Sequence, residues 1–409
     1  MNNNYNIDYK ILLLRTENIV KQFITWVENE NFESYDLYDL MSTKFGISAR
    51  KIFFKSKILG SFLVSPILMS DIVFPFFSRR NMLKHRYPTA DAHFIKGYIN
   101  LYNMYGKSEY LKVAERLGDE LISESCKGYS GMCWGYPFDW LSSNEMWFKN
   151  TPFVTVTPYC YEAFKSLYET TNDKNYLNIL KSITDFFVND LNETRISDNS
   201  VALSYSPIDY TKVFNANAYS ALIFAESYKM FRNNDFKRKA ELIVNFIIQN
   251  QEKDGSWYYS IDNPHERFID NFHTCFILKN LYKVNKILNS ENIKNAIIKG
   301  YKYYYNNLFL ENGEPKPFAI SKKLNLLIME SYDFAEGISL GVLLSDIINY
   351  SFDKSCLLAE RLFDKYKTPN GYFITRIIFP GIKLKIPYFR WAQSQTFFAL
   401  TELLKKLFG

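Results

Sequence analysis

The chain has 409 residues, of which 47% are hydrophobic and 22% are charged, a balance typical of a folded protein and not of a disordered one. Its net charge of +6 is mild, and the basic residues are expected to be interspersed with acidic ones. This argues against a nucleic-acid-binding protein, which would carry a basic stripe.

The first residues, "MNNNYNIDYKILLL", lack the basic region, apolar run and cleavage site of a signal peptide. The five cysteines are an odd number and lie far apart in the sequence: Cys126, Cys133, Cys160, Cys275 and Cys356. Both features predict a cytoplasmic protein with free thiols.

The apolar segment 58–77, "ILGSFLVSPILMSDIVFPFF", is long enough to suggest a membrane span. Pro66, Pro75 and Asp71 disfavour a lone spanning helix. We therefore expect a buried hairpin or a surface segment that touches a membrane.

Two kinds of helix alternate along the rest of the chain. The first kind carries charges on one face and apolar residues on the other, at 110–122, 176–191, 236–249 and 355–366. The second kind begins with polar and aromatic residues and then becomes almost uncharged, at 87–102, 152–168, 213–228, 268–282, 330–344 and 388–404. The uncharged helices are expected to form an inner layer and the charged ones an outer layer.

A loop with Gly or Pro and a short β-like stretch follows each charged helix, about every 55 to 65 residues. This period predicts a helical repeat of two helices and one hairpin. Roughly six such pairs fit, and they close into an all-α, (α/α)6 toroid with short β-hairpin loops at one end. We expect residues 1–409 to form a single domain, with residues 1–86 as its least regular part.

In such a ring, the first residues of all inner helices meet at the same end, so polar residues far apart in sequence converge there. We expect a substrate cavity at this end, with Asp139, His273 and Glu336 as acid or base candidates. Substrate-binding candidates share hydrogen-bonding or stacking side chains: Trp134, Tyr136, Tyr205, Asn215, Asn217, Trp257, Asp270, Asn271, Tyr332, Asp333, Arg390, Trp391 and Gln393. Neither a cofactor nor a metal ion is expected.

Each candidate also has a purely structural interpretation. Asp270 or Asn271 would cap the helix that begins near Phe272, and His273 would be a hydrogen-bonded core histidine. Glu336 lies in an uncharged helix, where a buried carboxylate needs a partner or a task, and Arg390 is a possible partner. The run "QEKDGSW" (251–257) matches the Gln-x3-Gly-x-Trp pattern of triterpene cyclases, but it occurs once and without an Asp-x-Asp-Asp motif.

The polar segments resemble those of helical-toroid proteins from bacterial and archaeal polysaccharide biosynthesis clusters, within the six-hairpin glycosidase-like superfamily. The matching segments lie in order along most of the chain: "YDLYD" (35–39), "GMCWGYPFDW" (131–140), "TPFVTVTPY" (151–159), "LSYSPID" (203–209), "VFNANAYSALI" (213–223), "FIDNFHTCFIL" (268–278) and "FRWAQSQTFFAL" (389–400). Cys275 and "MESYDFAEG" (329–337) depart from the usual pattern. "AEGISLGVLL" is also loosely similar to one helix of glucuronyl C5-epimerases.

The resemblance implies a role in making exopolysaccharide, capsule or another surface glycan. The leading hypothesis is an enzyme acting on an oligosaccharide or lipid-linked sugar, as a hydrolase, lyase or uronate epimerase. The alternatives are a non-catalytic glycan-binding or scaffold subunit, in peripheral contact with membrane-bound polysaccharide machinery, and a terpene-type cyclase. Two carboxyl groups about 5 to 10 Å apart across a cleft would favour hydrolysis, whereas a histidine or tyrosine with one carboxylate and an arginine would favour proton abstraction.

Overall fold

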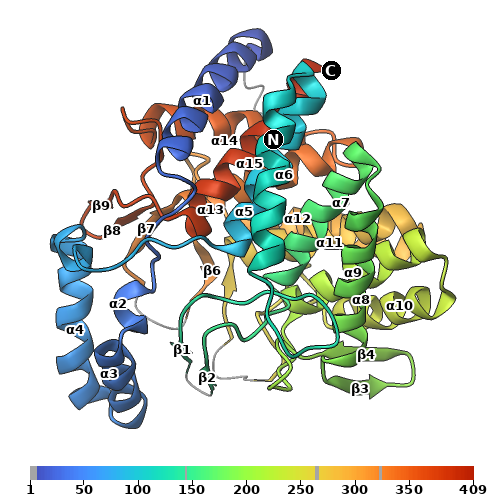
Figure 1. Cartoon of the computed structure of the whole chain (residues 1–409), viewed down its shortest axis with the longest axis horizontal. Coiled ribbons are helices and arrows are strands. Elements are labelled where there is room, and N and C mark those ends of the chain that lie inside the picture. The colour runs from blue at the N-terminus through green and yellow to red at the C-terminus, as the bar shows by residue number, and fades with distance from the viewer. Residues whose placement is uncertain (1–6, 143–144, 263–266, 322–324) are drawn as a thin grey trace.

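A computed structural model describes residues 7–142, 145–262, 267–321 and 325–409 (Figure 1). Across these ranges two sets of helices alternate. The inner set consists of α5 (Pro88–Tyr105), α7 (Thr157–Thr171), α9 (Phe214–Phe231), α11 (Asn271–Leu288), α13 (Ser331–Leu343) and α15 (Ser394–Phe408). The outer set consists of α1 (Tyr9–Asn29), α6 (Ser108–Ser123), α8 (Lys174–Asn189), α10 (Asn234–Gln249), α12 (Glu291–Asn307) and α14 (Ser351–Lys365).

The inner helices form a closed ring. Each one contacts the inner helices before and after it, and α15 contacts both α13 and α5. Helix α1, from the other end of the chain, packs against α15 and completes the outer layer. The predicted (α/α)6 toroid is therefore confirmed. Because α1 and α15 join the two ends of the chain, we propose that residues 1–409 fold as one domain.

The inner and outer helices differ in how many of their residues are buried, as their charge patterns predicted. All residues from Phe214 to Ser227 in α9 are buried, because this helix has neighbours on every side. In the outer helix α10, the buried residues recur at helical spacing: Ala240, Ile243, Val244, Phe246 and Ile247. One face of α10 therefore covers the inner ring while the opposite face meets solvent.

A tight turn with left-handed backbone joins inner to outer helix in four of the described repeats. The residues that adopt it are Gly106, Asn172, Arg232 and Asn289, with φ between 51° and 68°. Glycine and asparagine reach this conformation at little cost, so three of the four turns use the expected residue types.

Short strands link the loops at the other end of the ring. Three pairs are hairpins within one loop: β1 (Trp140–Leu141) with β2 (Met146–Trp147), β3 (Glu193–Ser197) with β4 (Ser200–Leu203), and β8 (Arg376–Ile378) with β9 (Ile382–Leu384). The prediction of one hairpin per loop is wrong for the described residues of the loops before α11 and α13. There, β5 (Ile269–Asp270) pairs with β6 (Phe318–Ile320), and β7 (Leu327–Glu330) pairs with β8. Neighbouring loops lie side by side at this end, so their strand edges pair across repeats.

The segment between α1 and α5 contains α2 (Asp39–Ser42), α3 (Lys44–Lys55), α4 (Lys57–Val73) and η1 (Phe77–Arg79). Helices α3 and α4 form a hairpin that projects from the ring, at the lower left of Figure 1. Two further short elements are η3 (Leu344–Asp346) and η4 (Phe389–Gln393). In the described ranges, every helix is too short or too polar to cross a membrane.

Candidate active site

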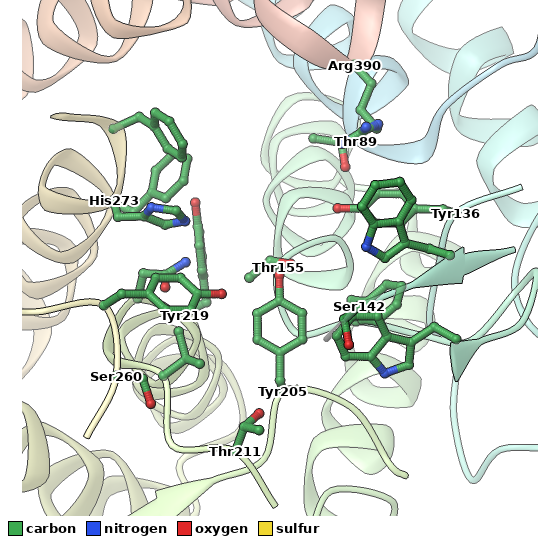
Figure 2. A pocket seen from close by; sticks show the side chains of 18 of the residues that line it. Thr89, Tyr136, Ser142, Thr155, Tyr205, Thr211, Tyr219, Ser260, His273 and Arg390 are labelled. Atoms are coloured by element: carbon green, nitrogen blue, oxygen red, sulfur yellow. Dashed lines mark hydrogen bonds between the residues drawn. The ribbon is translucent and has the colours of Figure 1, made fainter. Parts of the chain in front are cut away.

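A cavity of about 430 Å³ opens where the first turns of the inner helices meet the strand-bearing loops (Figure 2). Its wall is dominated by aromatic rings, among them Tyr38, Tyr136, Trp140, Trp147, Tyr159, Tyr205, Tyr219, Tyr259, Phe272, Tyr332 and Trp391. Figure 2 shows His273 reaching in from one wall, with Tyr136 and Arg390 on the opposite side. Such a wall offers both flat apolar faces and hydroxyl groups, the combination that binds sugars.

His273 and Asp270 form a hydrogen-bonded pair at the start of α11. One Asp270 oxygen, Oδ1, accepts from the His273 backbone N–H at 3.1 Å, which caps the helix. The other, Oδ2, lies 2.6 Å from His273 Nδ1. In neutral His273 this bond places the proton on Nδ1, so Nε2 is an acceptor. His273 lines the cavity and is 23% exposed, whereas Asp270 is buried.

Arg390 is held by the carboxylate of Asp36. Its Nε and Nη2 donate to the two Asp36 oxygens at 2.6 and 2.7 Å. The guanidinium also lies over the ring of Tyr136, 4.6 Å from its centroid. This bidentate pairing compensates the arginine charge. Among the described residues, none accepts a hydrogen bond from Nη1, which leaves this nitrogen for a ligand.

Three tyrosines form one side of the cavity. The hydroxyl groups of Tyr159 and Tyr219 hydrogen-bond to each other, and the ring of Tyr332 stacks on Trp391 at 4.9 Å. Burial raises the pKa of all three hydroxyls well above the usual tyrosine value. They are therefore neutral hydrogen-bond donors at physiological pH.

The carboxylates of the described cavity lining are those of Glu145 and Asp262. Asp262 pairs with the Lys212 ammonium group and also accepts from the Lys212 backbone N–H. Glu145 is exposed. Within the described ranges, no three His, Cys, Asp or Glu side chains gather as a metal ion would require.

No protein-family model matches the chain, and no curated protein sequence does. Solved structures do match. A sugar epimerase from a ruminal bacterium aligns with 78% of this chain and 87% of its own, at a TM-score of 0.62 and 13% identity. Cellobiose 2-epimerase from Spirochaeta thermophila aligns with 79% of this chain and 86% of its own, at a TM-score of 0.58 and 11% identity.

A D-mannose isomerase aligns with 78% of this chain and 87% of its own, at a TM-score of 0.58 and 13% identity. At 11 to 13% sequence identity, this structural similarity shows that these proteins and the present chain share a fold. This fold is the (α/α)6 toroid that the sequence predicted.

Seven predicted site residues line the cavity: Tyr136, Tyr205, Asn215, His273, Tyr332, Arg390 and Trp391. The Tyr205 hydroxyl bonds Thr155 Oγ1 at 2.8 Å. Asn215 is buried, and its Oδ1 has no partner in the described protein. A ligand hydroxyl would satisfy this oxygen.

The other predicted acid or base candidates lie outside the cavity lining. Asp139 Oδ1 accepts from the Lys149 backbone N–H at 2.7 Å and so fastens the loop that contains β1 and β2. Glu336 is 2% exposed and forms an ion pair with Lys279 instead of Arg390. Asp333 is buried, and burial together with the nearby Glu330 charge raises the pKa of its carboxyl well above the usual range.

Several predicted binding residues contact the protein's own backbone instead. The indole N–H of Trp134 donates to Leu121 at 2.7 Å, and that of Trp257 donates to Ile247 at 2.9 Å. Both rings belong to the core. The "QEKDGSW" segment is thus a packing element, as its single copy indicated.

Buried amides fasten the inner helices to neighbouring loops. Asn217 bonds both the N–H and the C=O of Leu203, and Gln393 does the same with Phe373. Asn271 donates to the carbonyls of Leu308 and Lys316. These three residues lie outside the cavity lining.

Sequence reasoning missed several lining residues, including Tyr38, Trp147, Tyr219, Tyr259, Phe272 and Phe276. Helical spacing contained a signal for two of them. Tyr219 follows Asn215 by four residues and Phe276 follows His273 by three, so each lies one turn further along the same helix face. The rings from loops carried no comparable signal.

Proposed function

We propose that the protein is a carbohydrate-active enzyme that transfers a proton at the carbon next to a sugar carbonyl, as an isomerase or epimerase. The observation that carries this proposal is the Asp270–His273 pair, which directs an unprotonated imidazole nitrogen into an aromatic cavity. Histidine is the side chain best suited to accept and return a proton near neutral pH.

In the proposed reaction, His273 Nε2 removes the proton from C2 of an open-chain aldose. Asp270 stabilises the imidazolium that results and keeps its ring in place. The electron pair of the C–H bond moves into the carbonyl and forms an enediolate. Return of the proton by His273, after the enediolate has turned its other face of C2 toward the imidazole, gives the epimer. Return of the proton to C1, together with transfer of the O2 hydroxyl proton to O1, gives the ketose.

The developing negative charge on the carbonyl oxygen requires hydrogen-bond donors that are already in place. Arg390 Nη1, the neutral hydroxyl of Tyr332 and one hydroxyl of the Tyr159–Tyr219 pair, whose other hydrogen lies between the two oxygens, are donors of this kind. Asp36 holds the guanidinium in one orientation, so little reorganisation is needed during the reaction.

The cationic side chains at and near the cavity are already paired with carboxylates, which favours a neutral sugar over a uronate as the substrate. Arg390 is paired with Asp36, and Lys212 is paired with Asp262. A uronate carboxylate would therefore find no uncompensated cation among the described lining residues. The aromatic faces would instead stack on an uncharged sugar ring.

The toroids that match this chain include proteins named as a sugar epimerase, a cellobiose 2-epimerase and a D-mannose isomerase, which supports this class of reaction. Others are named as a glycosyl hydrolase of family 88 and a polysaccharide lyase. Hydrolysis through Glu145 and Asp262 is the second candidate, but the Asp262 carboxylate is already engaged by the ammonium group and the backbone N–H of Lys212. The sequence resemblance supports a place in surface-glycan biosynthesis in the cytoplasm.

The test is incubation with neutral reducing mono- and disaccharides in deuterated water. We expect deuterium at C2 of the aldose and its epimer, or at C1 of a ketose product, detected by NMR. His273→Gln should abolish exchange and retain sugar binding, whereas the control His85→Gln, at an exposed histidine, should behave like the wild type. New reducing ends would indicate a hydrolase, and binding without exchange or cleavage would indicate a glycan-binding protein.

A further inference from the structure

The hairpin of α3 and α4 exposes an unusual concentration of large apolar side chains. Gly60 is the one fully buried residue among the 17 of α4. Ile58 and Phe62 are each 75% exposed, and the other exposed residues of this segment are Leu59, Leu68, Met69, Val73, Phe74, Phe76 and Phe77. Folded proteins normally scatter such residues singly, so a continuous apolar segment indicates an interaction site.

The same segment carries the excess positive charge of the protein. Residues 44–84 contain eight Lys and Arg against one acidic residue, Asp71, a net charge of +7. The whole chain has +6, so all other residues together carry −1. The expectation that charges are evenly interspersed is therefore wrong here. Exposed lysines lie along α3 and at the start of α4, at Lys44, Lys51, Lys55 and Lys57.

Apolar and basic side chains together match the surface of an anionic bilayer. Helix α4 has 17 residues, and a helix of that length measures about 25 Å, less than the hydrocarbon core of about 30 Å. The exposed large apolar residues of α4 lie on the side of the helix opposite Gly60, and the exposed Lys51, Lys55 and Lys57, close to them in sequence, supply the positive charge that an anionic bilayer attracts. We propose that the α3–α4 hairpin is a membrane anchor that inserts into one leaflet of an anionic membrane without crossing it.

Buried contacts hold the hairpin together and join it to the segments beside it. A side chain at Gly60 would collide with the backbone of Phe53, its Cβ lying 2.0 Å from Phe53 Cα, so α3 and α4 pack closely. Arg79 is fully buried, pairs with Asp71 in α4 and Asp39 in α2, and lies over the ring of Tyr388, 5.4 Å from its centroid. These contacts link α4 to α2 and to the segment that leads into α15.

Arg50 connects the hairpin to the cavity. Its guanidinium lies over the ring of Trp140, 4.0 Å from the centroid, and donates to the carbonyl of Leu141. Trp140 lines the cavity. An inserted hairpin therefore holds one wall of the cavity close to the membrane.

Flotation with lipid vesicles tests the anchor without reference to any enzymatic activity. We expect the full-length protein to float with vesicles of mixed phosphatidylcholine and phosphatidylglycerol, less so with phosphatidylcholine alone, and less so at high salt. Phe62→Ser/Phe74→Ser/Phe77→Ser and Lys51→Glu/Lys55→Glu/Lys57→Glu should each lower the bound-to-free ratio by about tenfold or more.

Matched controls change the same residue types elsewhere. Phe148→Ser/Phe408→Ser removes exposed rings outside the hairpin, and Lys181→Glu/Lys229→Glu/Lys302→Glu makes the same change in net charge on exposed lysines. Both should float like the wild type, with unchanged circular dichroism. Equal flotation of hairpin variants and wild type would overturn the proposal. So would a wild type that ignores vesicles and forms a dimer which the Phe62 variant dissociates, since the hairpin would then bind a second copy.

Discussion

Asp270 caps α11 and holds the ring of His273 with the two oxygens of one carboxylate. From the sequence, Asp270 had two alternative interpretations, a helix cap and a site residue. The side chain of Asp270 can have both roles at once. The combination has a physical advantage. Because the cap fixes the Asp270 carboxylate to the helix backbone, the orientation of His273 follows from the helix itself.

Substitutions of Asp270 separate the two roles. Asparagine is as good a cap as aspartate, so Asp270→Asn should change the free energy of unfolding by less than about 0.5 kcal/mol. It should nevertheless lower the rate of C2 proton exchange by about 10²- to 10⁴-fold, because the amide cannot stabilise the imidazolium. Asp270→Ala should lower the rate of C2 proton exchange in the same way. It should also lower the free energy of unfolding by about 1 kcal/mol, because the helix cap is lost. Denaturant titration and NMR exchange measure the two effects, and a fully active Asp270→Asn would remove the pair from the mechanism.

Lys354 is a buried lysine whose stability effect depends on pH. Its Nζ donates to the Gly313 carbonyl at 3.1 Å and lies 3.6 Å from the centroid of the Phe309 ring. Burial, assisted by the charge of Arg361, lowers the pKa of Lys354 to about 7. The unfolded chain keeps its proton up to the ordinary lysine pKa of about 10.4. The folded state is therefore penalised most below pH 7, and its stability rises with pH between the two values.

We expect Lys354→Met to stabilise the protein, and to do so more at about pH 6 than at about pH 9, by roughly 2 kcal/mol. Guanidinium unfolding at both pH values measures the difference. Lys302→Met, at an exposed lysine, is the control and should show no pH-dependent gain. An equal gain at both pH values would mean that Lys354 stays protonated in the folded protein across this range, as it does in the unfolded chain.

At the scale of elements, the polar residues at the start of each inner helix serve mainly to join repeats. Asn217 in α9 bonds the N–H and C=O of Leu203 in β4, at 2.8 and 3.1 Å, and also the Val213 carbonyl. Strand β4 pairs with β3 along one edge, and the buried amide of Asn217 satisfies the backbone groups on its other edge. Binding and packing thus use the same residue types at neighbouring helix positions.

Asn217→Ala should destabilise the protein by about 2 to 3 kcal/mol, because buried backbone groups of β4 lose their partners. The exposed Asn189, which donates to the Asp185 carbonyl within α8, provides the control. Asn189→Ala should cost less than about 0.5 kcal/mol. Thermal unfolding compares the two, and a small effect of Asn217→Ala would show that water replaces the amide.

At the scale of the whole molecule, charged side chains fill the middle of the inner ring. Lys96 and Lys283 both pair with Glu162, and Lys279 pairs with Glu336. Glu402 accepts from Ser339 in the same region, where a small pocket lies between the inner helices. Six inner helices leave a central space, and this network fills it with paired charges.

Removing Glu336 alone should therefore cost about 3 to 5 kcal/mol, because Lys279 is left buried without its partner. Glu336→Leu/Lys279→Met should recover most of that loss. Catalytic rate per folded molecule should stay unchanged in the double variant, which distinguishes a structural ion pair from an acid–base role. The exposed pair Lys237–Glu241 is the control, and Glu241→Leu should cost less than about 1 kcal/mol. Denaturant unfolding and exchange kinetics provide both readouts.

Much of the ring was predictable because the residue pattern within each helix reflects whether that helix is buried on one side or on all sides. The uncharged run from Phe214 to Ala225 in α9 and the one-sided apolar pattern of α10 distinguish inner from outer helices without any knowledge of contacts. His273 and Arg390 were identifiable as cavity-lining candidates because they begin inner helices or the segments leading into them. Asp36 carried no such signal as the partner of Arg390, since 354 residues separate the two.

Periodicity, charge and loop spacing determined the toroid by themselves, because burial on one side or on all sides selects residues at fixed helical intervals. They could not distinguish Asn215, which lines the cavity, from Asn217, which fastens β4. The two lie two residues apart, on different faces of one helix turn. The tertiary structure decided which face meets the cavity and which charges are paired, because both depend on neighbours from distant parts of the chain.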